Sequence, residues 1–264
     1  MNKKYEFTGE TKEHEGRTLH RIRRIKDGLV GGWIESEFNL SHKDNCFIYD
    51  NAMVFGNARM YNDAEVYNNV EVYNNAEIFG CAEIFGDARV YGDVVIYGYA
   101  RVFGNAKIYG DAEICDNARI YGNAEIYDNA RVYNDAEVYG RVEVYDNTEV
   151  YDNAKVFGNA RIYGYAEIFG DARVCGRARI YEGRIIGQVS QSYKDIFQHQ
   201  CKNRTLTAIL TEDNKILYNV GCQNNITKEV FLNRIYNENG GLEKKPHRKE
   251  YLRLIPLIEQ YFKN

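Results

Sequence analysis

Hydrophobic residues recur along the middle of the chain at every sixth position. From Ile48 to Ile186, all 24 residue numbers divisible by six carry Ile, Val or Met. Two residues before these positions lies a small side chain, which is Ala at 18 of the 23 positions from Cys46 to Ala178. A charged residue mostly stands between the two, and Tyr or Phe mostly follows the aliphatic residue. Because small and aliphatic positions alternate with charged and aromatic ones, each unit predicts a short strand with one buried face.

The two remaining positions of each unit predict a turn. Of the 23 residues from Asp50 to Glu182 that follow the aromatic position, 13 are Gly, five are Asp and four are Asn. These residue types tolerate a positive φ or form local side-chain turns. A period of six fits neither a helix nor a coiled coil. We therefore expect an all-β solenoid, a triangular parallel β-helix of about 18 residues per turn, with about eight coils between residues 46 and 186.

An aliphatic residue with a small residue two places before it resembles the signature of the hexapeptide-repeat family of left-handed parallel β-helices. The resemblance covers residues 46–186, and it implies the left-handed winding, which the period alone does not show. The uniform repeats followed by a small tail are similar to an uncharacterised bacterial and prophage branch of that family, often labelled as transferases. If a phage encodes the protein, that resemblance implies that the protein sequesters a factor of the host.

The segments on either side of the repeat predict two further units. Residues 1–45 break the six-residue phase and are expected to cap the solenoid, with short strands near 4–7 and 18–22 and an irregular coil around Trp33 to Leu40. Residues 187–264 predict a small C-terminal α+β domain. Its expected elements are a hairpin of 205–211 with 216–220, a helix from Thr227 to about Asn239, and a second helix from about His247 that kinks or restarts at Pro256.

Charge and composition narrow the range of partners. The formal charge of −4 gives no overall attraction to nucleic acid, and residues 48–186 carry 22 acidic against 13 basic residues, which argues against nucleic acid along the shaft. Residues 187–264 reverse this balance, with 12 basic against 8 acidic residues. No apolar run predicts a membrane span or a signal core. Six Cys without framework spacing suit a reducing compartment, so we expect a cytoplasmic protein.

The best-known enzymes of the resembling family are trimeric acyltransferases that use CoA or carrier-protein thioesters and carry a catalytic His on or near a coil. None of the five His of this chain lies in 46–186, and no insertion interrupts the repeat there. No position therefore matches the general base of that family. We expect a non-enzymatic scaffold without a cofactor. The alternative is an acyltransferase whose catalytic groups lie at the interfaces between protomers.

The outward aromatic positions form the most unusual surface that the sequence predicts. Of the 23 positions from Tyr49 to Tyr181, 15 are Tyr, six are Phe and two are Cys. They fall into three stripes, and either of two roles explains them: stacking between coils, or a binding face for a protein partner or a second protomer in a homo-oligomer. The candidate binding residues belong to one stripe: Tyr73, Tyr91, Tyr109, Tyr127, Tyr145 and Tyr163.

Charged and metal-ligating residues add little to this prediction. Opposite charges meet between neighbouring coils of the expected solenoid at nine places, against seven places with like charges: Arg59/Glu77, Glu71/Arg89, Glu83/Arg101, Lys107/Glu125, Glu113/Arg131, Arg119/Glu137, Arg131/Glu149, Glu137/Lys155 and Glu143/Arg161. The Asp and Asn residues at the turns lack the nine-residue spacing of calcium-binding repeats. His199, Cys201 and Cys222 lack paired zinc-ligand spacing, so no metal site is predicted.

The sequence thus predicts a rigid, capped β-solenoid that binds a macromolecular partner through its aromatic faces or its C-terminal domain. The unbroken repetition without catalytic residues is the basis of this interpretation.

Overall fold

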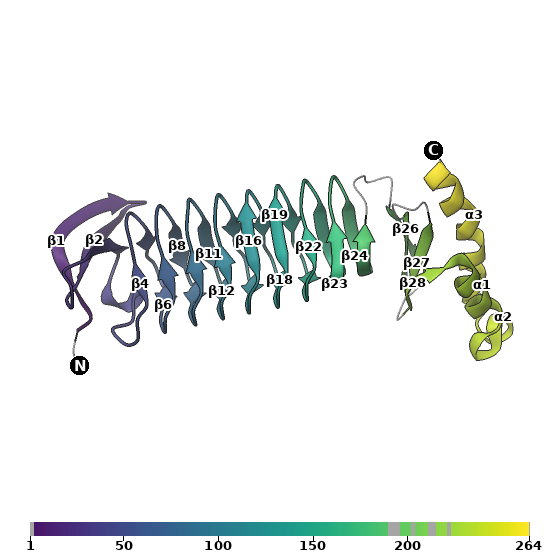
Figure 1. Cartoon of the computed structure of the whole chain (residues 1–264), viewed down its shortest axis with the longest axis horizontal. Helices are drawn as coiled ribbons and strands as arrows, with labels where there is room; N and C mark the ends of the chain where they lie inside the picture. Colours follow the sequence, from purple (N-terminus) through teal and green to yellow (C-terminus); the bar gives the residue numbers. More distant parts are fainter. Residues whose placement is uncertain (1–2, 190–195, 202–203, 211–214, 221–222, 264) are drawn as a thin grey trace.

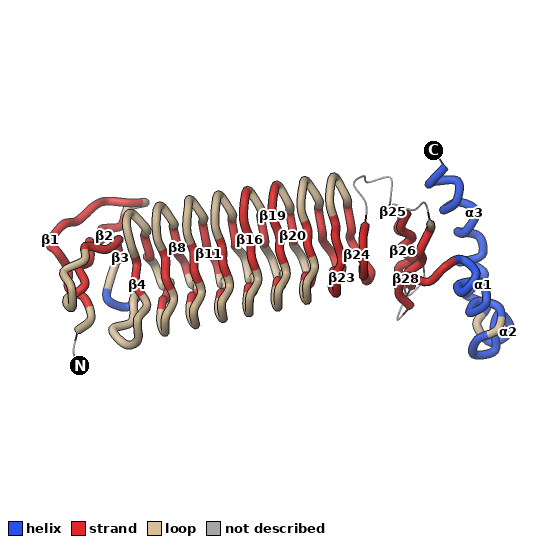
Figure 2. The backbone as a smooth tube through the Cα atoms, viewed as in Figure 1, coloured by secondary structure: helices blue, strands red, loops and turns tan. Residues whose placement is uncertain are grey.

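The computed structural model describes residues 3–189, 196–201, 204–210, 215–220 and 223–263. These residues form a long shaft of stacked coils, a β-hairpin over its N-terminal end, and a small sheet with helices beyond its C-terminal end (Figure 1). Each coil of the shaft joins short strands by tight turns (Figure 2). The shaft is a β-solenoid of about eight turns, as the six-residue period predicts.

The strands of the shaft are mostly two residues long and pair in parallel with the strands one coil before and one coil after them. Val90, for example, pairs with both Val72 and Ile108, and these three residues lie on every third strand of the chain. Three strands therefore complete one coil. The strands are β4 (Phe47–Ile48), β5 (Met53–Val54), β6 (Arg59–Met60), β7 (Glu65–Val66), β8 (Glu71–Asn74), β9 (Glu77–Ile78), β10 (Glu83–Ile84), β11 (Arg89–Gly92), β12 (Val95–Ile96), β13 (Arg101–Val102), β14 (Lys107–Ile108), β15 (Glu113–Ile114), β16 (Arg119–Gly122), β17 (Glu125–Ile126), β18 (Arg131–Val132), β19 (Glu137–Gly140), β20 (Glu143–Val144), β21 (Glu149–Val150), β22 (Lys155–Val156), β23 (Arg161–Val174) and β24 (Arg179–Val189).

The core of the shaft consists of the aliphatic and small positions of the repeat. The aliphatic side chains from Ile48 to Ile180 and the small side chains from Cys46 to Ala178 are all buried. Thr148, which takes an Ala position, is also buried and donates its hydroxyl to the carbonyl of Tyr145 at 2.7 Å. This bond satisfies a hydroxyl that is buried away from water. Burial of two apolar side chains in each unit is the main source of the stability of the shaft.

The turns adopt the left-handed backbone that their residue types predict. The residue after the aromatic position has a positive φ whether it is Gly, Asn or Asp, as at Gly92 (95°), Asn74 (62°) and Asp128 (55°). At Gly92 an added Cβ would also stand 2.6 Å from the carbonyl oxygen of Gly110 in the next coil. Both conformation and space therefore require Gly at that turn.

The regular phase ends one unit earlier than the sequence predicts. Ile168 pairs with Ile185, which is buried, whereas Ile186 pairs with Phe169. The core position of this unit is therefore taken by Ile185, and the prediction that placed Ile186 there is wrong. β24 runs through residues 181–183 as one strand, and the pairing distance to β23 falls from 18 residues at Ile180 to 17 at Ile185. A second register shift follows, so that Val189 pairs with Val174, only 15 residues before it.

The N-terminal end is closed by an antiparallel hairpin of β1 (Tyr5–His14) and β2 (Arg17–Arg24), and β2 continues the ladder onto β3 (Val30–Ile34). β3 already belongs to the solenoid, since Ile34 pairs in parallel with Val54. A 3-10 turn, η1 (Glu37–Asn39), follows, and Leu40 bridges to Met60. The first coil is therefore irregular: Ile34 and Leu40 keep the six-residue spacing on either side of the 3-10 turn, and two extra residues lie between Leu40 and Ile48, so both pair 20 residues further on, not 18.

The C-terminal sheet is antiparallel and contains β25 (Ile196–Cys201), β26 (Arg204–Leu210), β27 (Ile216–Val220) and β28 (Gln223–Thr227) in that order. The predicted hairpin corresponds to β26 and β27, and the sequence analysis missed β25 and β28. Ile209 of β26 packs into the core of the shaft. The sheet therefore covers the last coil.

Helices pack on the other face of this sheet: α1 (Lys228–Tyr236), η3 (Glu238–Gly240), α2 (Gly241–Lys244), η4 (Pro246–Arg248) and α3 (Lys249–Lys263). The α1 N-cap is Thr227, as predicted, and its hydroxyl accepts from the Val230 N–H. α3 continues through Pro256, so the predicted restart there is wrong. Pro256 is exposed, and buried residues on both sides of it, Leu254 and Ile258 among them, hold the helix against the sheet. We call residues 196–263 the head. None of the helices in the described residues combines the length and apolar character needed to cross a membrane.

Candidate functional site

The six candidate tyrosines form one continuous ladder along the shaft. Each ring stacks on the ring one coil away, with centroids 4.8 to 5.2 Å apart and planes within 7° of parallel. The ladder extends to Phe55 at the N-terminal end. All six side chains are half-buried, because each ring covers the faces of its neighbours. The geometry supports the stacking role for these aromatic residues, and their role in binding stays a prediction.

Six of the eight tyrosines on the other two faces are hydrogen-bonded to glutamates of the next coil. The hydroxyl donates to the carboxylate 16 residues further on, as at Tyr49–Glu65 (2.8 Å) and Tyr61–Glu77 (3.0 Å). Burial and the bond to Glu77 raise the pKa of Tyr61 to about 12. In the candidate ladder, burial and the charge of Glu125 also raise the pKa of Tyr109 to about 12. These hydroxyls are therefore neutral donors at physiological pH and not bases.

The charged columns pair more fully than the sequence indicates. Eight of the nine predicted pairs form ion pairs at 2.9 to 4.0 Å, with Arg131 bridging Glu113 and Glu149. At the ninth position Arg59 lies over the Phe38 ring, and Glu77 accepts from Tyr61. These pairs are exposed and contribute little individually. These eight pairs engage seven of the 22 acidic residues of residues 48–186, so the shaft keeps an excess of negative charge.

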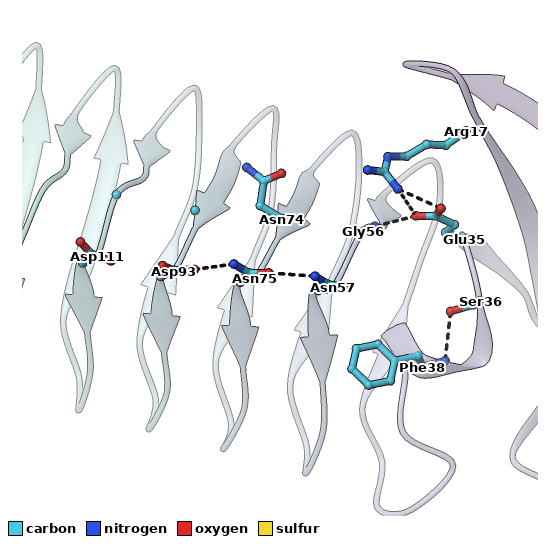
Figure 3. Close-up of a pocket in the computed structure, with 12 residues that line it drawn as sticks. Arg17, Glu35, Ser36, Phe38, Gly56, Asn57, Asn74, Asn75, Asp93 and Asp111 are labelled. Carbon is cyan, nitrogen blue, oxygen red and sulfur yellow. Dashed lines mark hydrogen bonds and ion pairs between the residues drawn. The ribbon is translucent and has the colours of Figure 1, made fainter.

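The turns carry ladders of side-chain amides and carboxylates. Asn57 donates to Asn75 at 3.0 Å, and Asn75 donates to Asp93 at 2.6 Å (Figure 3). This ladder lines an open groove of about 790 Å³ between the turns and the hairpin cap. Across the groove, both Glu35 oxygens accept from Arg17, and Glu35 also accepts from the Gly56 N–H. The groove is therefore polar, and the Arg17 guanidinium that lines it is already neutralised by Glu35.

Histidines lie at the two ends of the chain. In the coils from 46 to 186, the described residues contain no His. His14 nevertheless reaches the wall of the shaft from the tip of β1, where its ring meets the edge of Phe55 and its Nε2 lies 3.7 Å from Glu71. Sequence reasoning missed this approach because it depends on how the hairpin folds over the first coils.

A second cluster lies in the head, where β25 meets the start of α3. His199 and Cys201 are two residues apart on β25, and Glu250 stands in the first turn of α3. The potential ligand atoms of these three residues all lie within 4.8 Å of one another. Cys201 is buried, and this burial, aided by Glu250, raises the pKa of its thiol to about 11. The structure thus joins two of the three residues considered for zinc, whereas Cys222 lies outside the described residues.

The match between this chain and a known family lies in the shaft. Four of its segments match the model of the YdcK beta solenoid repeat: residues 47–62, 82–98, 124–140 and 168–188. The chain is a β-solenoid repeat protein. The description of that model names a repeat and no reaction, so it supports the repeat β-helix and leaves the transferase label of the hexapeptide branch as a proposal. A search of curated proteins finds no match.

Proposed function

We propose that this β-solenoid is a non-enzymatic scaffold that binds a protein partner through its head, which the shaft holds at a fixed distance from the N-terminal cap. The observation that supports this proposal is the outer face of α3. Its exposed residues combine positive charge with apolar surface at the spacing of one helical stripe: Lys249, Arg253, Pro256, Leu257, Gln260 and Lys263.

The face that α3 turns away from the sheet exposes apolar side chains. Leu257 is 53% exposed, and Tyr261 is 36% exposed beside it. The acidic residues of α3 lie toward its sides, where Glu250 pairs with His199 and Glu259 pairs with Lys228. Apolar residues surrounded by basic ones favour an amphipathic, acidic segment of another protein. The positive balance of residues 187–264 agrees with this chemistry.

The shaft contributes stiffness and spacing to this function. Its aromatic rings use their faces in stacking on one another, and eight ion pairs join neighbouring coils. Because these side chains already interact with one another, a partner that binds the shaft gains less interaction energy than one that binds the head. We therefore place the main contact on the head, and the ladder of six tyrosines is the second candidate surface. A prophage origin, sequestration of a host factor and a cytoplasmic location are consistent with such a scaffold.

Site-specific photocrosslinking in the full chain tests the proposal. A photoreactive amino acid at Leu257 is expected to capture one protein, and the same group at Asn129, an exposed turn of the shaft, is the matched control. Arg253→Glu should abolish capture at position 257 without changing the circular dichroism of the chain. Equal capture at both positions, or capture that survives Arg253→Glu, would overturn the assignment to the head.

The alternative function is an acyltransferase that uses CoA or a carrier-protein thioester. It predicts saturable binding of acetyl-CoA and release of free thiol by the purified protein. Detection of that turnover would replace the scaffold proposal, and light scattering of the same sample would show whether the protein forms a homo-oligomer.

A further inference from the structure

The head brings three different metal-ligating side chains to one point. In β25, His199 and Cys201 project from the same face of the strand, because side chains two residues apart share a face. Glu250 meets them from the first turn of α3, and its Oε1 lies 3.8 Å from the His199 Nε2. The packing of the helix on the sheet therefore joins residues that lie far apart in the sequence.

The spacing of the three groups suits a small divalent ion. Zinc binds imidazole nitrogen, thiolate sulfur and carboxylate oxygen at about 2.0 to 2.3 Å, so tetrahedral ligands stand roughly 3.3 to 3.6 Å apart. The His199–Glu250 distance of 3.8 Å is close to this separation, and the ligand atoms of all three residues lie within 4.8 Å. Small side-chain rotations therefore complete the geometry without movement of the backbone.

We propose that His199, Cys201 and Glu250 bind a divalent transition metal ion, zinc by the chemistry of the donor set. Binding replaces the thiol proton of Cys201, which passes to solvent, and forms a metal–thiolate bond. Cys201 is buried, whereas the side chains of His199 and Glu250 are 44% and 36% exposed. The fourth coordination position therefore faces solvent and is open to water or to a ligand.

The ion would connect an edge strand of the sheet to the helix that carries the proposed docking face. β25 lies at one edge, and it pairs with β26 alone among the described strands of this sheet. A metal bridge from β25 to α3 would lock the helix in place on the sheet. The site itself does not depend on the proposed partner, so metal binding and partner binding are separate measurements.

Cobalt substitution of the full chain tests the site. After removal of bound metal with a chelator, titration with Co²⁺ is expected to give one equivalent of binding and a thiolate-to-cobalt charge-transfer band in the near ultraviolet. Zinc should displace the cobalt and remove the band. Cys201→Ser should abolish the band, whereas Cys81→Ser, at a half-buried turn of the shaft, is the matched control and should retain it.

Two further variants keep the test decisive if Cys201→Ser fails to fold. Glu250→Gln and His199→Gln alter half-exposed side chains, and each should weaken Co²⁺ binding by roughly tenfold or more, with unchanged circular dichroism. Absence of the charge-transfer band in the wild type, its survival in Cys201→Ser, or weak binding of several equivalents would overturn the proposal.

Discussion

The rings of Tyr109 and Tyr127 lie 1° from parallel with their centroids 4.8 Å apart, and Tyr109 stacks in the same way on Tyr91 at 5.1 Å. The separation matches the spacing of hydrogen-bonded strands, so the coil pitch itself sets the stacking. Each ring therefore links consecutive coils from outside, while the aliphatic residues link them from within.

Tyr109→Ala should destabilise the shaft because it removes two stacked contacts at once. Aromatic pairs contribute about 0.5 to 1.5 kcal/mol each beyond buried area, so we expect a loss of about 2 kcal/mol in denaturant unfolding. Tyr109→Phe keeps the stack and should change the free energy of unfolding by less than about 0.5 kcal/mol. Tyr99, which is 66% exposed, is the control, and Tyr99→Ala should also stay within about 0.5 kcal/mol. Equal losses at positions 99 and 109 would contradict a stabilising ladder.

Gly92→Ala should lower the free energy of unfolding by more than the left-handed backbone at this position alone explains. Gly9 in the cap has nearly the same φ, 90° against 95°, but an added Cβ there meets no atom within 4 Å. Gly9→Ala is therefore expected to cost about 1 kcal/mol for the left-handed backbone. At Gly92 the clash with the Gly110 carbonyl adds roughly 1 to 3 kcal/mol. Chemical denaturation followed by circular dichroism compares the two, and a smaller loss at Gly92 would be inconsistent with close contact between coils.

Ile120→Asp should prevent the central coils from folding. Ile120 is fully buried between Val102 and Val138, where a carboxylate finds no partner, and the expected loss is about 4 kcal/mol or more. Asn123→Asp places the same charge on an exposed turn of the same coil and serves as the control. The melting curve of the control should match the wild type, and an unchanged curve for Ile120→Asp would refute the inward position of Ile120.

The shaft should lose stability in alkaline solution between about pH 10 and pH 12. Tyr61 and Tyr109 have folded-state pKa values of about 12, above the value of 10.0 for a free tyrosine. Between the two values the unfolded chain has released a proton that the folded chain retains, so the free energy of unfolding falls as pH rises. Below pH 10 both the folded and the unfolded chain keep the proton, so the contribution of these tyrosines to stability is fully present.

A double variant, Tyr61→Phe with Tyr109→Phe, tests the origin of this pH dependence. Phe cannot ionise, so the slope of unfolding free energy against pH should be shallower in the variant than in the wild type. Ultraviolet titration of tyrosinate in the folded protein gives the pKa values directly. An identical slope in both proteins would assign the alkaline loss to other groups.

Much of the shaft follows from local rules, which is why the sequence predicts it well. Burial at every sixth position, as at Ile120 and Val138, depends only on residue type and spacing within a unit. The turns at Asn74 and Gly92 likewise depend on the backbone preference of single residues. Repetition then sums these weak signals over many units, and the regular pairing between successive coils follows.

The ends of the molecule depend on contacts that no local rule specifies. Ile185 and Ile186 are both aliphatic, and only the pairing of β24 with β23 selects Ile185 for the core. The approach of His14 to Glu71 needs the fold of the hairpin, and α3 continues through Pro256 because buried neighbours hold it on the sheet.

The solenoid, its three-strand coils and the buried positions along it follow from the sequence alone, because a short period encodes each strand and turn locally. The face-to-face stacking of the tyrosine rings and the position of Glu250 beside His199 and Cys201 emerge only in the folded chain. These relationships join residues from different coils or elements, and the free energy of packing over the whole chain, not the preference of any single segment, brings them together.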